Sequence, residues 1–316
     1  MKKSAVIISI FIIFSIFAAE VDQFSGSQFR LNDSAGIINK KTDQLIDKAL
    51  ADANTKNHCN EKKLYSELRK QLRIKSWGKL VDFVERDPSV DRVRINIRNS
   101  IYSDFNVIDS LVLGVVAYTY SKPLGDILRV GDTYVGVDKF EHFLGRGFKY
   151  FNAHYLKNKP LAKVVKSLNN ERGILGAWTT GVMSYGDLSA NFNGMRFWNH
   201  ILLKKDDYFG SEWNLGPYII CQNDNWVKNK SIDWRNYFDN SMDESINCSK
   251  FRNKRQLRKV KNRLDILGQE FGRELNCPLD QNLFDQMMDK YGEYVFWLLN
   301  PDGLAVIDQE NDLYTF

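Results

Sequence analysis

Helical periodicity dominates the pattern of hydrophobic and polar residues along this chain. Apolar residues recur every three or four positions in the segments 42–53, 61–73, 77–86, 161–168, 188–203 and 284–299. This spacing places them on one face of an α-helix. Asp187 precedes one of these segments and is expected to be its N-cap. Residues 101–120 hold a further apolar segment, which ends before Pro123. The predicted fold class is therefore mostly α.

One short stretch has β character instead. The β-forming residues on both sides of Gly131-Asp132 predict a short hairpin over residues 125–136. The segment 90–99 fits either a helix or a strand. Residues 21–38 are polar and rich in Ser, Asp and Asn, and they are expected to form an extended lead-in to the first helix.

The first 19 residues have the organisation of a secretory signal peptide. A charged start at residues 1–3 is followed by an uncharged apolar run at 5–19 that ends in small residues. A membrane span needs about 20 apolar residues, so this run is short for a span. We therefore expect export to the periplasm or the medium, with a mature chain that starts at Glu20 and has no integral span. Phe17 departs from the usual pattern before the cut, so an uncleaved N-terminal anchor is the alternative.

The remaining chain is long enough for one large core with additions. We expect an N-terminal helical extension at 20–99, a catalytic core at 100–240 and a C-terminal helical extension at 241–316 that packs on the core. The protein is expected to be a monomer. The net charge of +5 includes Lys2 and Lys3, so the mature chain is only mildly basic and no nucleic-acid partner is expected.

The basic residues are concentrated in one segment. Residues 250–263 carry eight basic residues and no acidic residue. An apolar stripe at helical spacing runs through Leu257, Val260, Leu264 and Leu267. Such a run is a solvated helix face or a contact surface for an anionic polymer.

The cysteine count allows two disulfides in an exported protein. The four cysteines are Cys59, Cys221, Cys248 and Cys277, and none is spaced as Cys-x-x-Cys, which argues against a zinc cluster. Cys221 with Cys248 is the preferred pair.

The candidate chemistry begins on one predicted helix. Asp138, Glu141, His142 and Gly145 are spaced to share a helix face and could form the floor of a site. Glycine costs roughly 1 kcal/mol inside a helix. The pair Gly145 and Gly147 therefore indicates that another element packs closely there. The alternative is a structural cluster, in which Asp138 caps the helix and Glu141 pairs on the surface with Lys139 or Arg146.

Glycosidic-bond cleavage suits a glutamate in this setting. Partial burial favours the protonated form, so Glu141 could act as a general acid. Such a reaction needs a second group, and Glu171, before a glycine-rich turn, is the nearest further glutamate. Tyr185 and Thr180 could orient water or substrate.

Aromatic residues are concentrated between residues 208 and 238. They are Tyr208, Phe209, Trp213, Tyr218, Trp226, Trp234, Tyr237 and Phe238. Aromatic faces in a polar cleft suit stacking on sugar rings, and Trp213 and Trp226 are the candidate substrate-binding residues. The alternative is that these rings pin long loops to the body of the protein.

The segment from Lys139 to Phe143 resembles the catalytic-glutamate helix of lysozymes. The segment Gly173-Ile-Leu-Gly-Ala-Trp178, followed by 187–197, is similar in layout to goose-type lysozymes and lytic transglycosylases. More closely, the chain resembles the deacetylation-specific lysozymes of predatory bacteria. The resemblance covers roughly residues 100–240. The Gly-Leu-Met-Gln signature of the transglycosylases is replaced by Ile174-Leu175-Gly176, which leaves the second catalytic group open.

The resemblance implies a lysozyme-like helical core that cleaves peptidoglycan glycan strands without a cofactor or a metal. Glu141 would be the general acid and Glu171 the second carboxylate. Asp138, His142, Asp187 and Asn191 would hold these groups in place. Hydrolysis and transglycosylation, and the acetylation state of the preferred glycan, stay open.

Two other classes of function remain. Asp138-x-x-Glu141-His142 resembles an inverted zinc motif in which aspartate replaces the first histidine. Zinc prefers His and Cys ligands, and only His58, His154 and His200 could complete the set. The non-enzymatic alternative is an exported wall-binding or envelope scaffold protein.

Overall fold

The computed structural model describes residues 20–56, 58–73, 79–110, 113–114, 124–166 and 180–308. Helices make up most of the regular structure in these ranges, which confirms the mostly α fold class. The strands form three small sheets. The apolar segment predicted at 101–120 lies largely outside the described residues. Residues 101–110, which are described, form turns.

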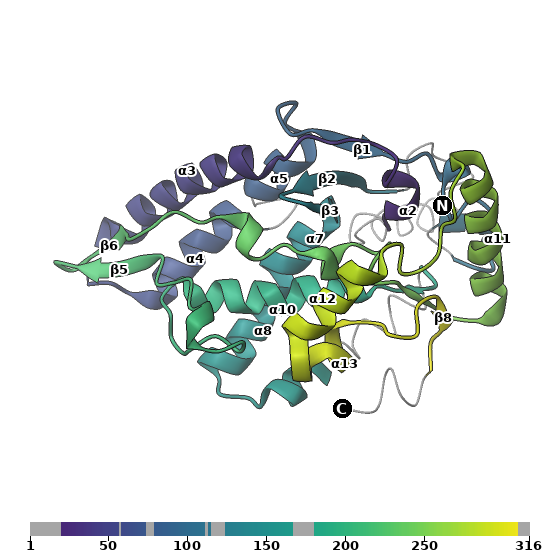
Figure 1. Ribbon diagram of the computed structural model, residues 1–316. Coiled ribbons are helices and arrows are strands. Elements are labelled where there is room, and N and C mark those ends of the chain that lie inside the picture. The colour runs from purple at the N-terminus through teal and green to yellow at the C-terminus, as the bar shows by residue number, and fades with distance from the viewer. Residues whose placement is uncertain are drawn as a thin grey trace, which may run out of the picture.

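Three helices form one end of the molecule (Figure 1). They are α3 (Ala35–Ala53), α4 (Glu61–Leu72) and α5 (Lys79–Arg86). Each contains a predicted amphipathic segment, although α3 begins well before residue 42. Their apolar faces are buried at, for example, Leu45, Leu68 and Val84. The 3₁₀ turn η1 (Asn54–Lys56) follows α3.

The predicted hairpin is present. Strands β2 (Asp126–Val130) and β3 (Thr133–Gly136) pair antiparallel around Gly131-Asp132, and Gly131 has a φ of 61°. Strand β1 (Arg92–Arg94) pairs with β2, and the 3₁₀ turn η2 (Ile97–Asn99) follows β1. The ambiguous segment 90–99 is therefore a short strand and a turn.

A helix with two π segments runs directly out of this hairpin. It consists of α7 (Val137–Glu141), the π segment η3 (His142–Arg146), α8 (Gly147–Phe151) and the π segment η4 (Asn152–Leu156). Residues 161–166 are helical and fall within the predicted helix at 161–168. A π turn widens the backbone, and π segments are frequent at functional sites. Here the indole of Trp198 donates a hydrogen bond to the Leu144 carbonyl at 3.1 Å.

The π-containing helix crosses α10 (Tyr185–His200) at two glycines. A Cβ on Gly147 would lie 2.5 Å from the Cα of Gly194. A Cβ on Gly194 would overlap the carbonyl oxygen of Phe143. The close packing predicted from the glycines is thus correct for Gly147. At Gly145 the nearest atom to an added Cβ is Arg73 Nε at 3.6 Å, which is an ordinary contact.

Aromatic rings fill the space behind this crossing. The ring of Phe143 lies 5.5 Å from Phe197, 5.4 Å from Trp234 and 5.1 Å from Phe238, measured between centroids. The same apolar cluster includes residues from all three predicted parts of the chain, such as Leu45, Phe143 and Phe284. The predicted extensions therefore share a core with residues 100–240.

The rest of the fold surrounds α10. It comprises β4 (Val182–Met183), η5 (Ser211–Trp213), the hairpin β5 (Ile219–Gln222) and β6 (Asn225–Lys228), η6 (Trp234–Asn236), η7 (Asn240–Met242), β7 (Lys250–Phe251), α11 (Lys254–Phe271), α12 (Gln281–Tyr291), η8 (Gly292–Tyr294), α13 (Val295–Leu298) and β8 (Ala305–Val306). Strand β7 lies between β4 and β8 in one sheet.

Two predicted helix boundaries are wrong. The N-cap of α10 is Ser184, whose hydroxyl accepts a hydrogen bond from the Asp187 amide, so Asp187 lies in the first turn. The single helix predicted at 284–299 is interrupted at Gly292, whose φ of 50° ends α12. Glycine adopts a positive φ at little cost, so it suits this helix end.

The extended lead-in is also wrong. Residues 21–26 are buried and include the short helix α2 (Gln23–Gly26). Asp22 accepts hydrogen bonds from the amides of Ser25 and Ile101. Polar side chains can be buried when they are hydrogen-bonded, so a polar sequence did not prevent this segment from entering the core.

The disulfides connect differently from the predicted pair. Cys59 is bonded to Cys221, and Cys248 to Cys277, with Cα separations of 5.8 and 6.3 Å. The first joins the α3–α4 connection to β5. The second joins the residues just before β7 to the segment before α12. Spacing in the sequence could not predict these partners because each bond depends on how distant elements pack.

Within the described ranges, no helix combines the length and the apolar character that a membrane crossing requires.

The glycine crossing gives a direct stability test. We expect Gly194→Ala to destabilise the fold by roughly 1–3 kcal/mol, because the methyl group collides with the Phe143 carbonyl. Gly145→Ala is the matched control, and removing a helical glycine there should be neutral or stabilising by up to about 1 kcal/mol. Urea unfolding of both variants provides the measurement. Equal effects at the two positions would contradict the close crossing.

Candidate functional site

The predicted helix face meets α10 through a buried lysine. Lys139 is 1% exposed. Its Nζ lies 2.6 Å from Asp138 Oδ2, 2.8 Å from Asp187 Oδ1 and 2.6 Å from Glu244 Oε1. We refer to Asp138, Lys139, His142, Asp187 and Glu244 as the Lys139 cluster.

His142 extends the cluster toward solvent. Its Nε2 lies 3.2 Å from Asp187 Oδ2, and its Nδ1 lies 3.2 Å from Asn191 Oδ1. Residues 138 and 142 are one turn apart on the first helix, as 187 and 191 are on α10, so the two helices present matching polar faces. The side chains of His142 and Asp187 are 18% and 26% exposed, which makes this pair the open side of the cluster.

Glu244 is held in place from several sides. The hydroxyls of Ser184 and Ser249 donate to its carboxylate at 2.7 and 3.1 Å, and its backbone amide donates to Gln23 Oε1 at 2.8 Å. Ser184 is also the N-cap of α10, so one hydroxyl connects the helix start to the cluster. The N-terminal segment, α7, α10 and the loop after η7 therefore meet at one point.

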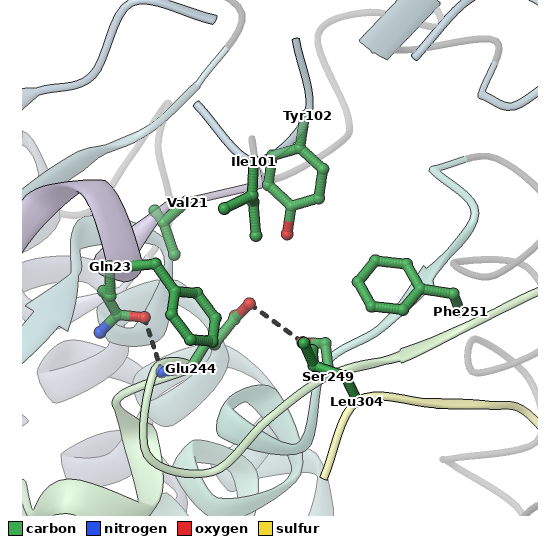
Figure 2. Close-up of a pocket in the computed structure, with 9 residues that line it drawn as sticks. Val21, Gln23, Ile101, Tyr102, Glu244, Ser249, Phe251 and Leu304 are labelled. Atoms are coloured by element: carbon green, nitrogen blue, oxygen red, sulfur yellow. Dashed lines mark hydrogen bonds between the residues drawn. The ribbon is translucent and has the colours of Figure 1, made fainter. Parts of the chain in front are cut away.

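A small cavity lies beside Glu244 (Figure 2). Its lining residues are Val21, Gln23, Phe24, Ile101, Tyr102, Glu244, Ser249, Phe251 and Leu304. Figure 2 shows the Glu244 carboxylate at its edge, bonded to Ser249. The cavity has room for about one water molecule, so it is too small for a sugar ring.

The carboxylates of the cluster differ in their protonation behaviour. Burial raises the pKa of Asp138 to about 7, and the charges of Asp187 and Glu244 add to the rise while Lys139 opposes it. Burial alone would raise the pKa of Asp187, but the charges of His142 and Lys139 hold it below its usual value. Burial would lower the pKa of Lys139, but the three carboxylates hold it well above the usual value. Near neutral pH the cluster therefore keeps a charged Lys139 and a charged Asp187.

The three carboxylates also have the geometry of a cation site. Oxygens of Asp138, Asp187 and Glu244 lie within 4.8 Å of one another. The Lys139 ammonium stands among them, where a divalent cation would bind. A metal ion could therefore enter only if Lys139 moved away.

The other histidines lie elsewhere and have other partners. His58 is exposed beside Asp224, and His154 contacts the Tyr208 hydroxyl and the Lys159 carbonyl. His200 is fully buried between Asp207 and Tyr237. The histidine set that the inverted zinc motif would need is not assembled around His142 in the described part of the chain.

Of the two predicted catalytic glutamates, only Glu141 lies among the described residues. Glu141 is the last residue of α7, half-buried, and directly precedes the first π segment. Glu171 and the glycine-rich segment 173–178 lie outside the described residues. The surface pairing of Glu141 with Lys139 is wrong, because Lys139 is buried in the cluster.

Thr180 and Tyr185 lie near the cluster but are buried. Thr180 is 5% exposed and hydrogen-bonds the Glu20 side chain. Burial and the charges of Glu244 and Asp187 raise the pKa of Glu20 well above its usual value. The ring of Tyr185 packs with Met183 and Ile307.

The predicted aromatic loops are mostly part of the core. Five of the eight rings are at most 6% exposed, namely those of Tyr218, Trp226, Trp234, Tyr237 and Phe238. The backbone of Trp226 is also fixed by two hydrogen bonds with the Asn54 side chain. These rings pin the loops, as the alternative interpretation holds. Trp213 is 38% exposed, packs edge-on against Phe209 and has the Lys290 ammonium 5.8 Å from its ring centroid, so only part of its ring is open to a ligand.

Two arginines that pair with no carboxylate of the described residues lie beside the π-containing helix. Arg73 Nε faces Gly145, and the guanidinium of Arg69 lies 4.3 Å from the Phe148 ring centroid. The Nε atoms of both are buried and make no hydrogen bond. Burial, and then the charge of Arg69, lowers the pKa of Arg73 to about 10. This pair is a candidate contact for an anionic group one turn beyond Glu141.

Sequence reasoning missed Lys139 and Glu244 as cluster members, and it missed Ser184 as the hydroxyl that donates to Glu244. Lys139 stands between Asp138 and Phe140, where a lysine with a carboxylate neighbour is usually a surface residue. Glu244 lies in a polar loop far along the chain. No local pattern distinguishes it from other loop acids, so only the folded arrangement identifies it.

We expect Lys139→Met to cost roughly 3–5 kcal/mol of stability, because it leaves buried carboxylates without their cation. Lys70→Met is the matched control, since that lysine also pairs with a carboxylate, Glu67, but is 61% exposed and should cost at most about 1 kcal/mol. Denaturant unfolding compares the two. The Lys139→Met deficit should shrink as the pH falls and the carboxylates become protonated. A deficit that does not change with pH would contradict this arrangement.

The raised pKa of Asp138 should make the free energy of unfolding fall as the pH rises from about 4 to 7. Its folded pKa of about 7 is above its unfolded value, so the native state holds the proton more tightly. The stabilisation is complete below the unfolded pKa and is lost as the pH passes the folded pKa. Asp138→Asn should flatten that part of the stability–pH curve. An unchanged curve would show that Asp138 titrates normally.

Comparisons of the chain with protein-family models, with curated proteins and with solved structures found no match.

Proposed function

We propose that the protein is an exported glycoside hydrolase that cleaves peptidoglycan glycan strands, with Glu141 as the general acid. The observation that carries the proposal is the setting of Glu141. It is a half-buried glutamate at the junction of an α and a π segment, between the Lys139 cluster and the Arg69–Arg73 pair. The two disulfides are compatible with export.

The Lys139 cluster supports the proposal by fixing the helix that carries Glu141. Asp138 and Lys139 precede it and His142 follows it. Lys139 pairs with Asp187 and Glu244 as well as with Asp138, and His142 pairs with Asp187. A general acid has to be positioned against one oxygen of its substrate. Anchoring the residues on both sides of Glu141 restricts the motion of its backbone.

The arginine pair supports an anionic glycan as the substrate. Peptidoglycan carries carboxylates on its muramic acid residues and stem peptides. Arginine binds carboxylates with two parallel hydrogen bonds, and Arg69 and Arg73 have no carboxylate partner among the described residues. The exposed ring of Trp213 offers a further surface for sugar stacking.

In the proposed reaction Glu141 protonates the glycosidic oxygen as the C–O bond breaks. The positive charge on the sugar is stabilised by a second carboxylate, for which Glu171 remains our candidate. If water attacks the sugar, the product has a reducing end and the enzyme is a hydrolase. If a hydroxyl of the sugar itself attacks, the product is an anhydro sugar and the enzyme is a lytic transglycosylase.

A binding protein without catalysis is the second candidate. Lys139 and its three carboxylates satisfy one another, as a purely structural ion cluster would. In that case the cluster only joins α7 to α10, and the exposed aromatic and basic groups hold the cell wall.

Glu141→Gln separates the two candidates, because it keeps the shape and removes the acid. We expect a loss of about 100–10,000-fold in the rate of peptidoglycan digestion. Binding to insoluble peptidoglycan and the unfolding midpoint should stay near the wild-type values. Glu171→Gln should lose as much activity if it is the second carboxylate.

The control is Glu274→Gln, an exposed glutamate on the segment after α11. Comparing the amounts of product released from normal and from deacetylated peptidoglycan identifies the preferred glycan. Reducing ends on the products indicate hydrolysis, and anhydro ends indicate transglycosylation. If Glu141→Gln digests peptidoglycan at the wild-type rate, Glu141 is not the acid. If the wild-type protein binds peptidoglycan but releases no fragments, the binding protein takes its place.

A further inference from the structure

The face of the molecule formed by α11 and the loop at 103–109 combines exposed aliphatic side chains with cations that pair with no carboxylate of the described residues. Val107 is 56% exposed and Ile108 is 69% exposed. Helix α11 lies at one edge of the molecule, at the right of Figure 1. The loop contacts the basic first half of this helix through Asp109, which pairs with Arg255 and Lys259.

The loop is fixed to the helix by charged hydrogen bonds. The Asp109 carboxylate is 1% exposed and pairs with Arg255 at 3.1 Å and Lys259 at 2.6 Å. Arg252 donates to the carbonyls of Ile108 and Asp109 at 3.0 and 2.9 Å. Val107 and Ile108 are therefore presented to solvent by a well-held loop.

The loop is also ordered from within. The Asn106 side chain accepts hydrogen bonds from the amides of Ile108 and Asp109, and the Asn106 amide donates to the Asp109 carboxylate. Burying an aliphatic side chain is favourable, so two aliphatic side chains held outward gain nothing for the isolated protein. Two adjacent aliphatic side chains on an ordered loop are a small apolar surface that a partner could cover.

The neighbouring helix face supplies positive charge. Lys254, Arg258 and Lys261 are exposed and are spaced along one face of α11. No carboxylate of the described residues forms an ion pair with these three. The acidic residues of α11 begin only at Asp265, in its second half. The loop is bonded to Arg255 and Lys259, which directly follow Lys254 and Arg258 in the sequence, so the apolar tip and the three cations flank the exposed face of α11 from two sides.

We propose that this surface binds the interface of a membrane that contains anionic phospholipid. The Val107–Ile108 tip would enter the boundary between headgroups and acyl chains, while Lys254, Arg258 and Lys261 contact the phosphates. Membrane-surface proteins combine these two contributions. A soluble polyanion would satisfy the cations but would leave the aliphatic tip in water. The proposal is independent of catalysis by Glu141.

The test is sedimentation with lipid vesicles. The exported protein is used, with its N-terminus determined by mass spectrometry, because a retained apolar run at 5–19 would itself bind lipid. We expect clear binding to vesicles of phosphatidylcholine mixed with phosphatidylglycerol and little binding to phosphatidylcholine alone. Added salt should weaken the binding.

Two variants separate the contributions. Replacing Lys254, Arg258 and Lys261 by glutamine should weaken binding by about 100-fold, or roughly fivefold for each charge. Val107→Ser with Ile108→Ser should weaken it by about tenfold or more. Because all five side chains are exposed, the thermal unfolding midpoints should stay unchanged.

Matched controls remove similar groups elsewhere. Glutamine at Lys157, Lys159 and Lys163 removes three exposed charges, and Ile37→Ser removes an exposed aliphatic side chain on α3. Both controls should bind as the wild type does. Equal binding to both kinds of vesicle overturns the proposal. Binding that loses affinity only in the charge variant also overturns it, because the aliphatic tip then contributes nothing to the contact with lipid.

Discussion

The arrangement of the fold depends on one buried ammonium. Lys139 brings three carboxylates from three separate parts of the chain to within hydrogen-bonding distance of a single nitrogen. A buried charge is expensive unless it is paired and hydrogen-bonded. The ammonium therefore fixes Asp138 on α7, Asp187 on α10 and Glu244 in the following loop relative to one another. The glycine crossing of Gly147 and Gly194 allows the two helices to come close enough for this to happen.

The sequence predicted those parts of the fold that depend on local pattern. Helical periodicity identified α3, α4, α10 and α11, and Gly131-Asp132 identified the hairpin. The spacing of Asp138 and His142 correctly predicted a polar helix face, and the paired residues Asp187 and Asn191 lie opposite it. These features depend on residues a few positions apart, which the sequence displays directly.

The failures concern residues whose partners are distant in the chain. Lys139 looked like a surface lysine because its carboxylate partners at 187 and 244 are remote. Residues 21–26 looked like a polar lead-in, yet Gln23 is bonded to Tyr134, Met242 and Glu244. The disulfide partners of Cys221 and Cys248 are likewise set by packing. In each case the residue takes its place because of a bond to a partner that is distant in the chain. The residue type alone does not reveal that partner.

The buried position of residues 21–26 has a consequence for the export that we propose. Gln23 is among the first residues of the expected mature chain to cross a membrane, whereas its partner Glu244 is 221 positions further along. The amino-terminal segment cannot take its native place until the last third of the polypeptide has been translocated. A chain exported in this order completes its core only near the end of its passage. The same order delays the pairing of Lys139 with Glu244 until then, so the Lys139 cluster is completed late.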